Sequence, residues 1–202
     1  MKVLKLNSIK MWMNLSVLSV IVLLFLAACG QSGGNKNTQT ENDVKAKSKV
    51  EKPKMDLQAA ILSDNLDMVK QHIEAGTDIN VKDQMSDSTP LITAATFGKT
   101  AIAKVLIDAN ADLDVKNNEG STALHAAAFF CHIEIVQMLI DAGANKSIKN
   151  KHGATPRESV IGPFAEMKPI YEMMQQQLGP LGLKLEMNEL EMARPVIAMM
   201  LQ

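Results

Sequence analysis

The sequence predicts an all-α solenoid of stacked pairs of short helices, and three observations support this fold class. Apolar residues recur at steps of three and four between residues 117 and 150, which is the spacing of amphipathic helices. The same residue types return at intervals of 33. The 202-residue chain is 47% hydrophobic, enough for one domain with a core. A short helical pair cannot bury both faces alone, so its copies must stack.

The best-formed copy spans Asn117 to Asn150 and shows two helices with marked ends. Thr122 is an N-cap candidate, because its hydroxyl can accept hydrogen bonds from first-turn N–H groups. Gly143 follows the second helix, where a left-handed residue can close it. The first helix carries alanines, which allow close approach, and the second carries large aliphatics. The apolar positions are Leu124, Ala127 and Ala128, then Ile133, Val136, Leu139 and Ile140.

The other copies align with this one. Thr89, Thr122 and Thr155 are 33 residues apart, and an earlier copy from Leu57 to Asp83 is offset by 34. The period, with Thr122-Ala123-Leu124-His125 and Thr89-Pro90-Leu91-Ile92, resembles the ankyrin repeat over roughly residues 57 to 160. Some positions depart from the pattern: Ile92 replaces the His, Asp64 and Cys131 replace a Gly, and Arg157-Glu158 replaces Leu-His in the fourth copy.

The resemblance implies an ankyrin-repeat solenoid at 55–160, with three full repeats and a divergent, interrupted fourth. It implies that the His125 imidazole bonds loop backbone between repeats. It also implies that a partner protein lies across the loop tips and the concave face of the first helices. The corresponding residues are Met85, Asp87, Thr96, Phe97, Asn118, Glu119, Ser121, Phe129, Phe130, Lys151 and His152.

Three of the five phenylalanines gather at that face: Phe97, Phe129 and Phe130. Aromatic residues are enriched in binding hot spots. Phe129 stands at the start of the turn between the two helices of the best-formed copy, and from there we expect it to project into the concave surface beside the tip residues. The alternative is that Phe97 and Phe130 pack between repeats and only Phe129 is exposed.

Residues 1–28 resemble a bacterial lipoprotein signal peptide. Lys2, Lys5 and Lys10 precede the apolar run 15–28, which is too short for a stable membrane span and ends in Leu26-Ala27-Ala28-Cys29. The resemblance implies lipidation of Cys29 and a place in the cell envelope. Gly30, which is not Asp, favours an outer membrane where one exists. A plain secretory cleavage and a short membrane anchor are the alternatives.

Residues 29–54 read as a lipidated cysteine and a disordered polar tether, since they contain almost nothing to bury. About 25 such residues span roughly 25–30 Å. The tether carries net charge +3, which either attracts it to anionic lipid or is simply solvated. From Met55 onward 12 basic residues face 19 acidic ones, so the domain is near −7. A negative surface repels phosphate backbones, so we expect no nucleic-acid partner.

Residues 161–202 read as a helical C-terminal extension. We expect a helix over 164–178, a turn at 178–182, an extended stretch at 183–187, and a last helix to about Leu201 that Asn188 and Glu191 open as a capping box. The last helix is interpreted as the displaced second helix of the fourth repeat, capping the stack. The alternative is an unrelated helical pair packed on the third repeat.

No residue set indicates catalysis, a metal or a cofactor. His125, Cys131 and His132 lie close in sequence, but no further His or Cys stands at ligand spacing. Cys29 would be consumed by lipid, leaving Cys131 without a disulfide partner. Seven of 14 methionines fall in the last 39 residues. They suit a core, a partner-facing patch or a soft-metal site.

We therefore expect a lipid-anchored, extracytoplasmic, monomeric ankyrin-repeat protein that binds another protein of the cell envelope. The rival hypothesis is a Met-rich segment that binds a soft metal or small ligand. An enzyme is the third hypothesis, disfavoured because no acid–base or nucleophile set is visible in the sequence.

Overall fold

A computed structural model describes residues 53–202, which contain eight α-helices, one short 3₁₀ helix and no strand. The predicted signal peptide at 1–28, Cys29 and nearly all of the tether lie outside the described residues. No helix within 53–202 is both long and apolar enough to cross a membrane.

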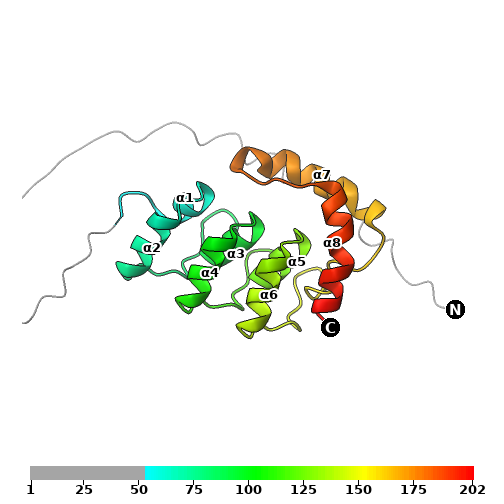
Figure 1. Cartoon of the computed structure of the whole chain (residues 1–202), viewed down its shortest axis with the longest axis horizontal. Coiled ribbons are helices and arrows are strands. Elements are labelled where there is room, and N and C mark those ends of the chain that lie inside the picture. Colours follow the sequence, from blue (N-terminus) through cyan, green and yellow to red (C-terminus); the bar gives the residue numbers. More distant parts are fainter. Residues whose placement is uncertain (1–52) are drawn as a thin grey trace, which may run out of the picture. The chain divides into compact units, whose positions relative to one another are not determined.

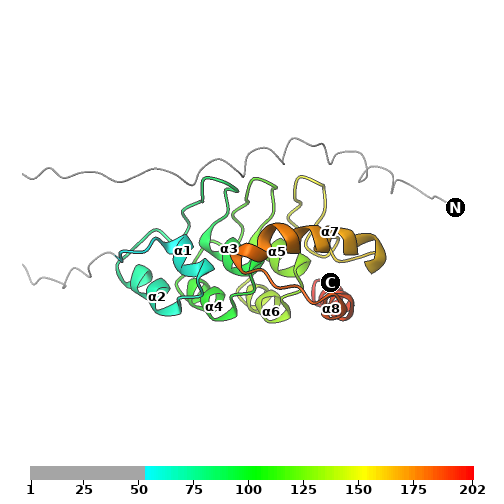
Figure 2. The ribbon, with the colours of Figure 1, turned by 90° about the horizontal axis from the view of Figure 1, so that it is seen from above.

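Three helical pairs stack in chain order, as predicted (Figure 1). The first helices α1, α3 and α5 contact one another in a row, and the second helices α2, α4 and α6 form a parallel row (Figure 2). The pairs are α1 (Leu57–Leu62) with α2 (Leu66–Glu74), α3 (Pro90–Thr96) with α4 (Thr100–Asp108), and α5 (Ala123–Phe129) with α6 (Ile133–Asp141).

Local sequence signals set the ends of these helices. Asp56, Asn65 and Thr89 each accept a hydrogen bond from a first-turn N–H group. Thr122 caps α5 in a reciprocal box, in which the His125 ring accepts from the Thr122 N–H in return. Gly143 has φ of 88° just after α6. The predicted roles of Thr122 and Gly143 are confirmed.

One core runs through the three repeats. Four alanines of α3 and α5 are fully buried and let the first helices approach closely: Ala94, Ala95, Ala127 and Ala128. Large aliphatics of the second helices, such as Leu106 and Leu139, fill the space between the two rows.

The C-terminal extension forms α7 (Phe164–Leu178), a 3₁₀ turn η3 (Gly179–Leu181) and α8 (Met187–Met200). The predicted α7 bounds are confirmed, with Pro169 inside the helix. A second core joins α7, the stretch after η3 and the first turn of α8 to the turn that follows α5. It consists of Phe130, Tyr171, Leu183, Leu185 and Leu190.

The fourth copy is interrupted, as the sequence indicates. Residues 156–160 form only a turn, although Thr155 and Glu158 still exchange the reciprocal hydrogen bonds of a capping box. Helix α8 contacts α6, as α6 contacts α4, and its Ile197 and the following Leu201 join the first core. Figure 2 shows α8 next to α6 at the end of the outer row. This position supports its interpretation as the displaced second helix of a fourth repeat.

The predicted capping box of Asn188 with Glu191 is wrong. Helix α8 begins at Met187, its N-cap is Glu186, and no side chain caps it. The Leu190 N–H already donates to the Glu186 carbonyl at 3.0 Å. The earlier start belongs to a helix that buries Leu190, Arg194 and Ile197 along one face. Burial of that face explains the start better than local capping does.

Candidate functional site

Three loops project from the same side of the stack, one before each of α3 and α5 and one after the third repeat (Figure 2). A side-chain oxygen folds each loop over itself. Asn117 accepts from the N–H groups of Glu119 and Ser121, and Asn150 accepts from those of His152 and Ala154. These Asx turns fix the loop tips, because the side chain replaces a backbone partner.

Asp83 plays the same part in the first loop. Its carboxylate accepts from the N–H groups of Met85, Ser86 and Ser88 at 2.7–2.8 Å and from the Ser86 hydroxyl at 2.6 Å. Partial burial raises the pKa of Asp83, but the hydrogen bonds from Ser86, Met85 and Ser88 outweigh it and bring the pKa below its ordinary value. The loop is therefore ordered by an ionised carboxylate at neutral pH.

Backbone hydrogen bonds join neighbouring loops in register. The Asn118 N–H donates to the Ser86 carbonyl and the Lys151 N–H to the Glu119 carbonyl, both at 2.9 Å. Gly120 permits this approach, since its φ is 71° and a Cβ there would lie 2.9 Å from the Lys151 nitrogen. The three loops thus form one stacked unit.

A second ladder, made by lysines, was not predicted. The Lys82 ammonium donates to the Lys116 carbonyl at 2.7 Å, and the Lys116 ammonium donates to the Lys149 carbonyl at 3.1 Å. The signal was present in the sequence, because these lysines follow the repeat offsets of 34 and 33. They reinforce the register of the loops from one repeat to the next.

The tip side chains point to solvent. Met85 is 82% exposed, and Glu119 and His152 face each other across two loops at 3.5 Å between Oε2 and Nε2. We call the following residues the tip surface, and the structure brings them together on adjacent loops: Met85, Asp87, Asn118, Glu119, Ser121, Lys151 and His152.

The phenylalanines lie elsewhere. They lie at the C-terminal ends of α3 and α5, whereas the tip loops precede the N-terminal ends, and all three pack in or against the second core with the extension. Phe130 is buried, and the Phe129 ring lies 5.0 Å from both the Phe130 and the Tyr171 ring. The Tyr171 hydroxyl also donates to the Phe129 carbonyl at 2.9 Å. The expectation that Phe129 projects freely beside the tip residues is therefore wrong. Phe97 packs, partly buried, on the same second core.

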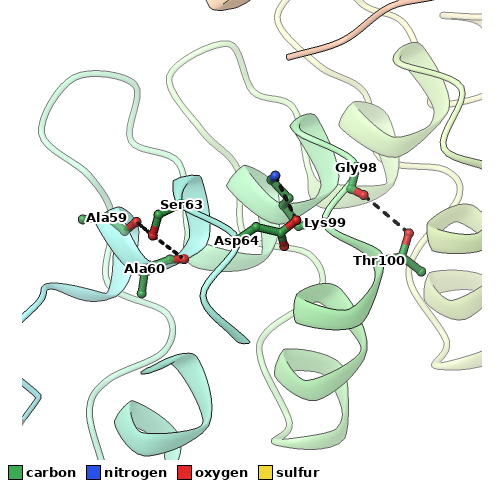
Figure 3. Close-up of polar contacts among 7 residues, drawn as sticks. All are labelled: Ala59, Ala60, Ser63, Asp64, Gly98, Lys99 and Thr100. Carbon is green, nitrogen blue, oxygen red and sulfur yellow. Dashed lines mark hydrogen bonds and ion pairs between the residues drawn. The ribbon is translucent and has the colours of Figure 1, made fainter. Parts of the chain in front are cut away.

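The turns between paired helices are also connected from repeat to repeat. Asp64, Gly98 and Cys131 hold the same left-handed turn position, with φ of 58°, 64° and 60°. Figure 3 shows Lys99 beside Gly98 reaching back to Asp64, with 3.2 Å between Nζ and Oδ2. A Cβ on Gly98 would lie 2.6 Å from the His132 ring, so a larger residue there would have to displace that ring.

The His125 and His132 rings serve the fold. The His125 Nδ1 accepts from the Thr122 N–H, so its Nε2 carries the proton and donates to the Ala154 carbonyl at 3.1 Å. This confirms the bridge to the next loop. The His132 Nε2 pairs with the Thr96 carbonyl at 3.3 Å. Burial lowers the pKa of both rings, which favours the neutral form.

The remaining chemical groups near α7 and α8 do not make a reactive centre. Burial raises the pKa of the Cys131 thiol to about 11 and that of Tyr171 to about 12, so both are protonated at neutral pH. Within residues 53–202, no three His, Cys, Asp or Glu side chains are placed to hold a metal ion. The groups supply packing and hydrogen bonds.

Six of the seven methionines of the extension divide between the two cores and the surface. Met167, Met174 and Met187 pack on the second core and Met200 on the first. Met192 and Met199 are exposed. Core packing therefore accounts for four of them, and none of these positions gathers with the tip surface.

The family comparison matches the repeats. A family model described as ankyrin repeats, in three copies, matches residues 57–150. Protein phosphatase 1 regulatory subunit 27 of Homo sapiens and of Mus musculus are each 41% identical to this chain over 64 residues, which is 32% of this chain. The match spans only 41% of the length of these curated relatives.

The solved structures agree. The ankyrin-repeat domain of Bcl-3, a member of the IkappaB protein family, is similar with a TM-score of 0.50 and 30% identity, over 51% of this chain and 45% of that one. Ankyrin repeats are typically interaction modules without enzymatic activity, and the 33-residue period and the two rows of helices now have a common explanation. Residues 57–150 of this chain form an ankyrin-repeat domain.

Proposed function

We propose that this protein captures a partner protein through the tip surface. One observation carries the proposal: the three loops are held in register by backbone bonds, while the side chains at their ends contact solvent. A surface that is already ordered loses little conformational entropy on binding. Binding residues are found disproportionately on loops that a rigid scaffold positions.

The composition of the tip surface favours a protein over other ligands. It combines an exposed thioether at Met85 with acidic, basic and amide groups, and adaptable methionine is common at protein-binding surfaces. The net charge near −7 from residue 55 onward disfavours nucleic acid. The curated relatives are named as regulatory subunits of a phosphatase, a name that implies assembly with another protein.

The phenylalanine group has no part in this proposed surface. Tyr171 and its neighbours on α7 occupy the face that the sequence suggested, so a partner meets the extension there rather than the aromatic rings. Thr96 is half-buried at the edge of the covered region. The proposal therefore keeps the tip half of the predicted site.

Location is the second part of the proposal. The Leu26-Ala27-Ala28-Cys29 run supports lipidation of Cys29, and the polar tether supports a domain that stands off the membrane. The partner is then another protein of the cell envelope. Cys29→Ser tests this part: we expect an unlipidated precursor that leaves the membrane fraction. Unchanged mass and fractionation of the variant would overturn it.

Photocrosslinking tests the binding surface. A benzophenone amino acid is placed at Met85 or Glu119 in the full chain. Lys104 on α4 and Gln137 on α6, the second helices of their repeats, are matched exposed controls. We expect one adduct of defined mass from the tip positions and none from the controls. We also expect Met85→Glu to remove the adduct at Glu119 without lowering Tm. Adducts from Lys104 or Gln137 alone would overturn the assignment of the binding surface to the loop tips.

A further inference from the structure

A groove of about 450 Å³ lies at the end of the stack, between residues 157–164 and one face of α8. Its α8 side consists of residues at helical spacing, including Glu191, Arg194, Ala198 and Met199. The groove exists because the fourth copy has no first helix. Residues 156–160 make only a turn there, so α8 lacks the neighbour that α5 provides to α6.

Arg194 lines this groove although it is only 2% exposed. Its Nη1 donates to the Tyr171 hydroxyl at 2.7 Å, and its guanidinium carbon lies 5.9 Å from the centre of the Tyr171 ring. Its Nη2 has no hydrogen-bond partner among the described residues. The ion pairs found within 53–202 do not include Arg194. A buried guanidinium without a counter-ion is costly, and such a group requires an explanation.

A second guanidinium lies along the same groove. Arg157 donates through Nε to the Ala198 carbonyl at 3.1 Å, which fixes its side chain against α8. Phe164 and the exposed Met199 add apolar surface. Glu191 is the acidic side chain of the lining and is exposed, whereas Arg194 is buried. Arg194 is therefore more deeply buried along the groove than Glu191, and Arg157 is half-buried.

We propose that this groove binds a small amphiphile, with an anionic headgroup near Arg194 and Arg157 and a short apolar chain along Met199. Guanidinium groups favour carboxylate and phosphate, which accept two parallel N–H bonds. The volume falls in the range of small-molecule sites. The site is separate from the tip surface and does not depend on it.

Titration calorimetry of the full chain in a nonionic detergent tests the proposal. The probes are hexanoate, hexyl phosphate and neutral 1-hexanol, so that the headgroup is the variable. We expect one anionic probe per chain, bound at least about tenfold tighter than the alcohol. The tighter of the two anions identifies the headgroup chemistry. Equal affinity for hexanoate, hexyl phosphate and hexanol would overturn the proposal.

Variants distinguish binding of the probe in the groove from partition of the probe into detergent, because the partition is the same for every variant. Arg157→Gln should weaken binding of the preferred anion at least about tenfold. Glu191→Gln should strengthen that binding, because a like charge is removed. Lys184→Gln, an exposed cation outside this groove, is the matched control and should change nothing. Arg194→Met should remove the preference for the anion. If that variant does not fold, Met199→Glu, at an exposed residue of the groove lining, replaces it in the test. Anion binding that is undiminished in both Met199→Glu and Arg157→Gln would refute the site.

Discussion

The repeats and the C-terminal extension are specified in different ways. In residues 57–150, the side chain next to each first helix caps it, and left-handed residues close the turns at fixed offsets. In the extension, Pro163 and Glu186 are N-caps without a side-chain hydrogen bond. The extension is instead held by long-range contacts, such as those from Tyr171 to Phe129 and from Arg194 to Tyr171.

This difference indicates an order of dependence. A repeat carries its helix signals locally and gains stability from the similar repeats that it contacts. The extension has weak local signals, and its second core is completed by Phe130 of the third repeat. We therefore expect the repeats to fold without α7 in place, whereas α7 requires the repeats.

Removal of residues 183–202 should have the largest effect. It deletes Ile197 and Leu201 from the first core and leaves the outer face of α6 uncovered. An exposed apolar end of a solenoid aggregates, so we expect the truncated chain in the insoluble fraction. Met199→Ser, which changes an exposed side chain of the same segment, should stay soluble. A soluble truncation that unfolds cooperatively would show that the repeats need no cap.

Leu139→Ala tests the repeats and the dependence of α7 on them. This side chain is fully buried in the first core, and its truncation should cost about 2–5 kcal/mol of unfolding free energy. Urea denaturation measures the loss, and Glu134→Ala on the exposed side of α6 is the matched control. Hydrogen exchange should show α7 losing protection together with α6. Protection of α7 that survives the loss of α6 would contradict the order of dependence.

Tyr171→Phe breaks the extension side with a smaller effect. It keeps the ring but removes the hydroxyl that donates to the Phe129 carbonyl and accepts from Arg194. A part-buried carbonyl and a buried guanidinium each lose a partner, so the loss of unfolding free energy should be about 1–3 kcal/mol. We expect faster amide exchange in α7 and unchanged exchange in α1 to α4. The control is Glu172→Gln, because Glu172 follows Tyr171 in the chain and its side chain is exposed.

The same contrast explains how much the sequence could predict. The 33-residue period predicted all three helical pairs, because each repeat shows its own caps and apolar spacing. It also predicted the tip surface, since the tips lie at fixed offsets. It did not predict the burial of Phe129, because that depends on where α7 lies, and no local pattern in residues 161–186 encodes a contact with residue 129.

Arg194 was missed for a related reason. A charged residue on a helix is expected at the surface, and only the three-dimensional arrangement shows it buried beneath Tyr171. The start of α8 at Met187 was missed because burial of Leu190 and Ile197 outweighs the capping preference of Asn188. In each case tertiary contact outweighed a local rule.

Mild acid should produce the smallest effect and should act on the repeats alone. The histidines with lowered pKa, His125 and His132, both belong to repeat 3, and residues 161–202 contain no histidine. Burial is the main cause of both shifts. The unfolded chain then binds protons at a higher pH than the folded chain does. Stability is therefore complete above about pH 6.5 and falls as the pH drops below it, until the folded rings also protonate.

The unfolding free energy can change by at most about 1.4 kcal/mol per pH unit for each histidine, since each ring binds one proton. Urea midpoints measured between about pH 7.5 and pH 5 should fall, and His125→Asn should flatten the curve by removing one of the two groups. Protonation of His125 also adds a proton at Nδ1, which can no longer accept from the Thr122 N–H. Loss of protection should thus begin at the start of α5 and in the loop around Ala154, to which Nε2 donates. Constant midpoints over this range, or protection lost first in α7, would show that the two rings do not set the acid response.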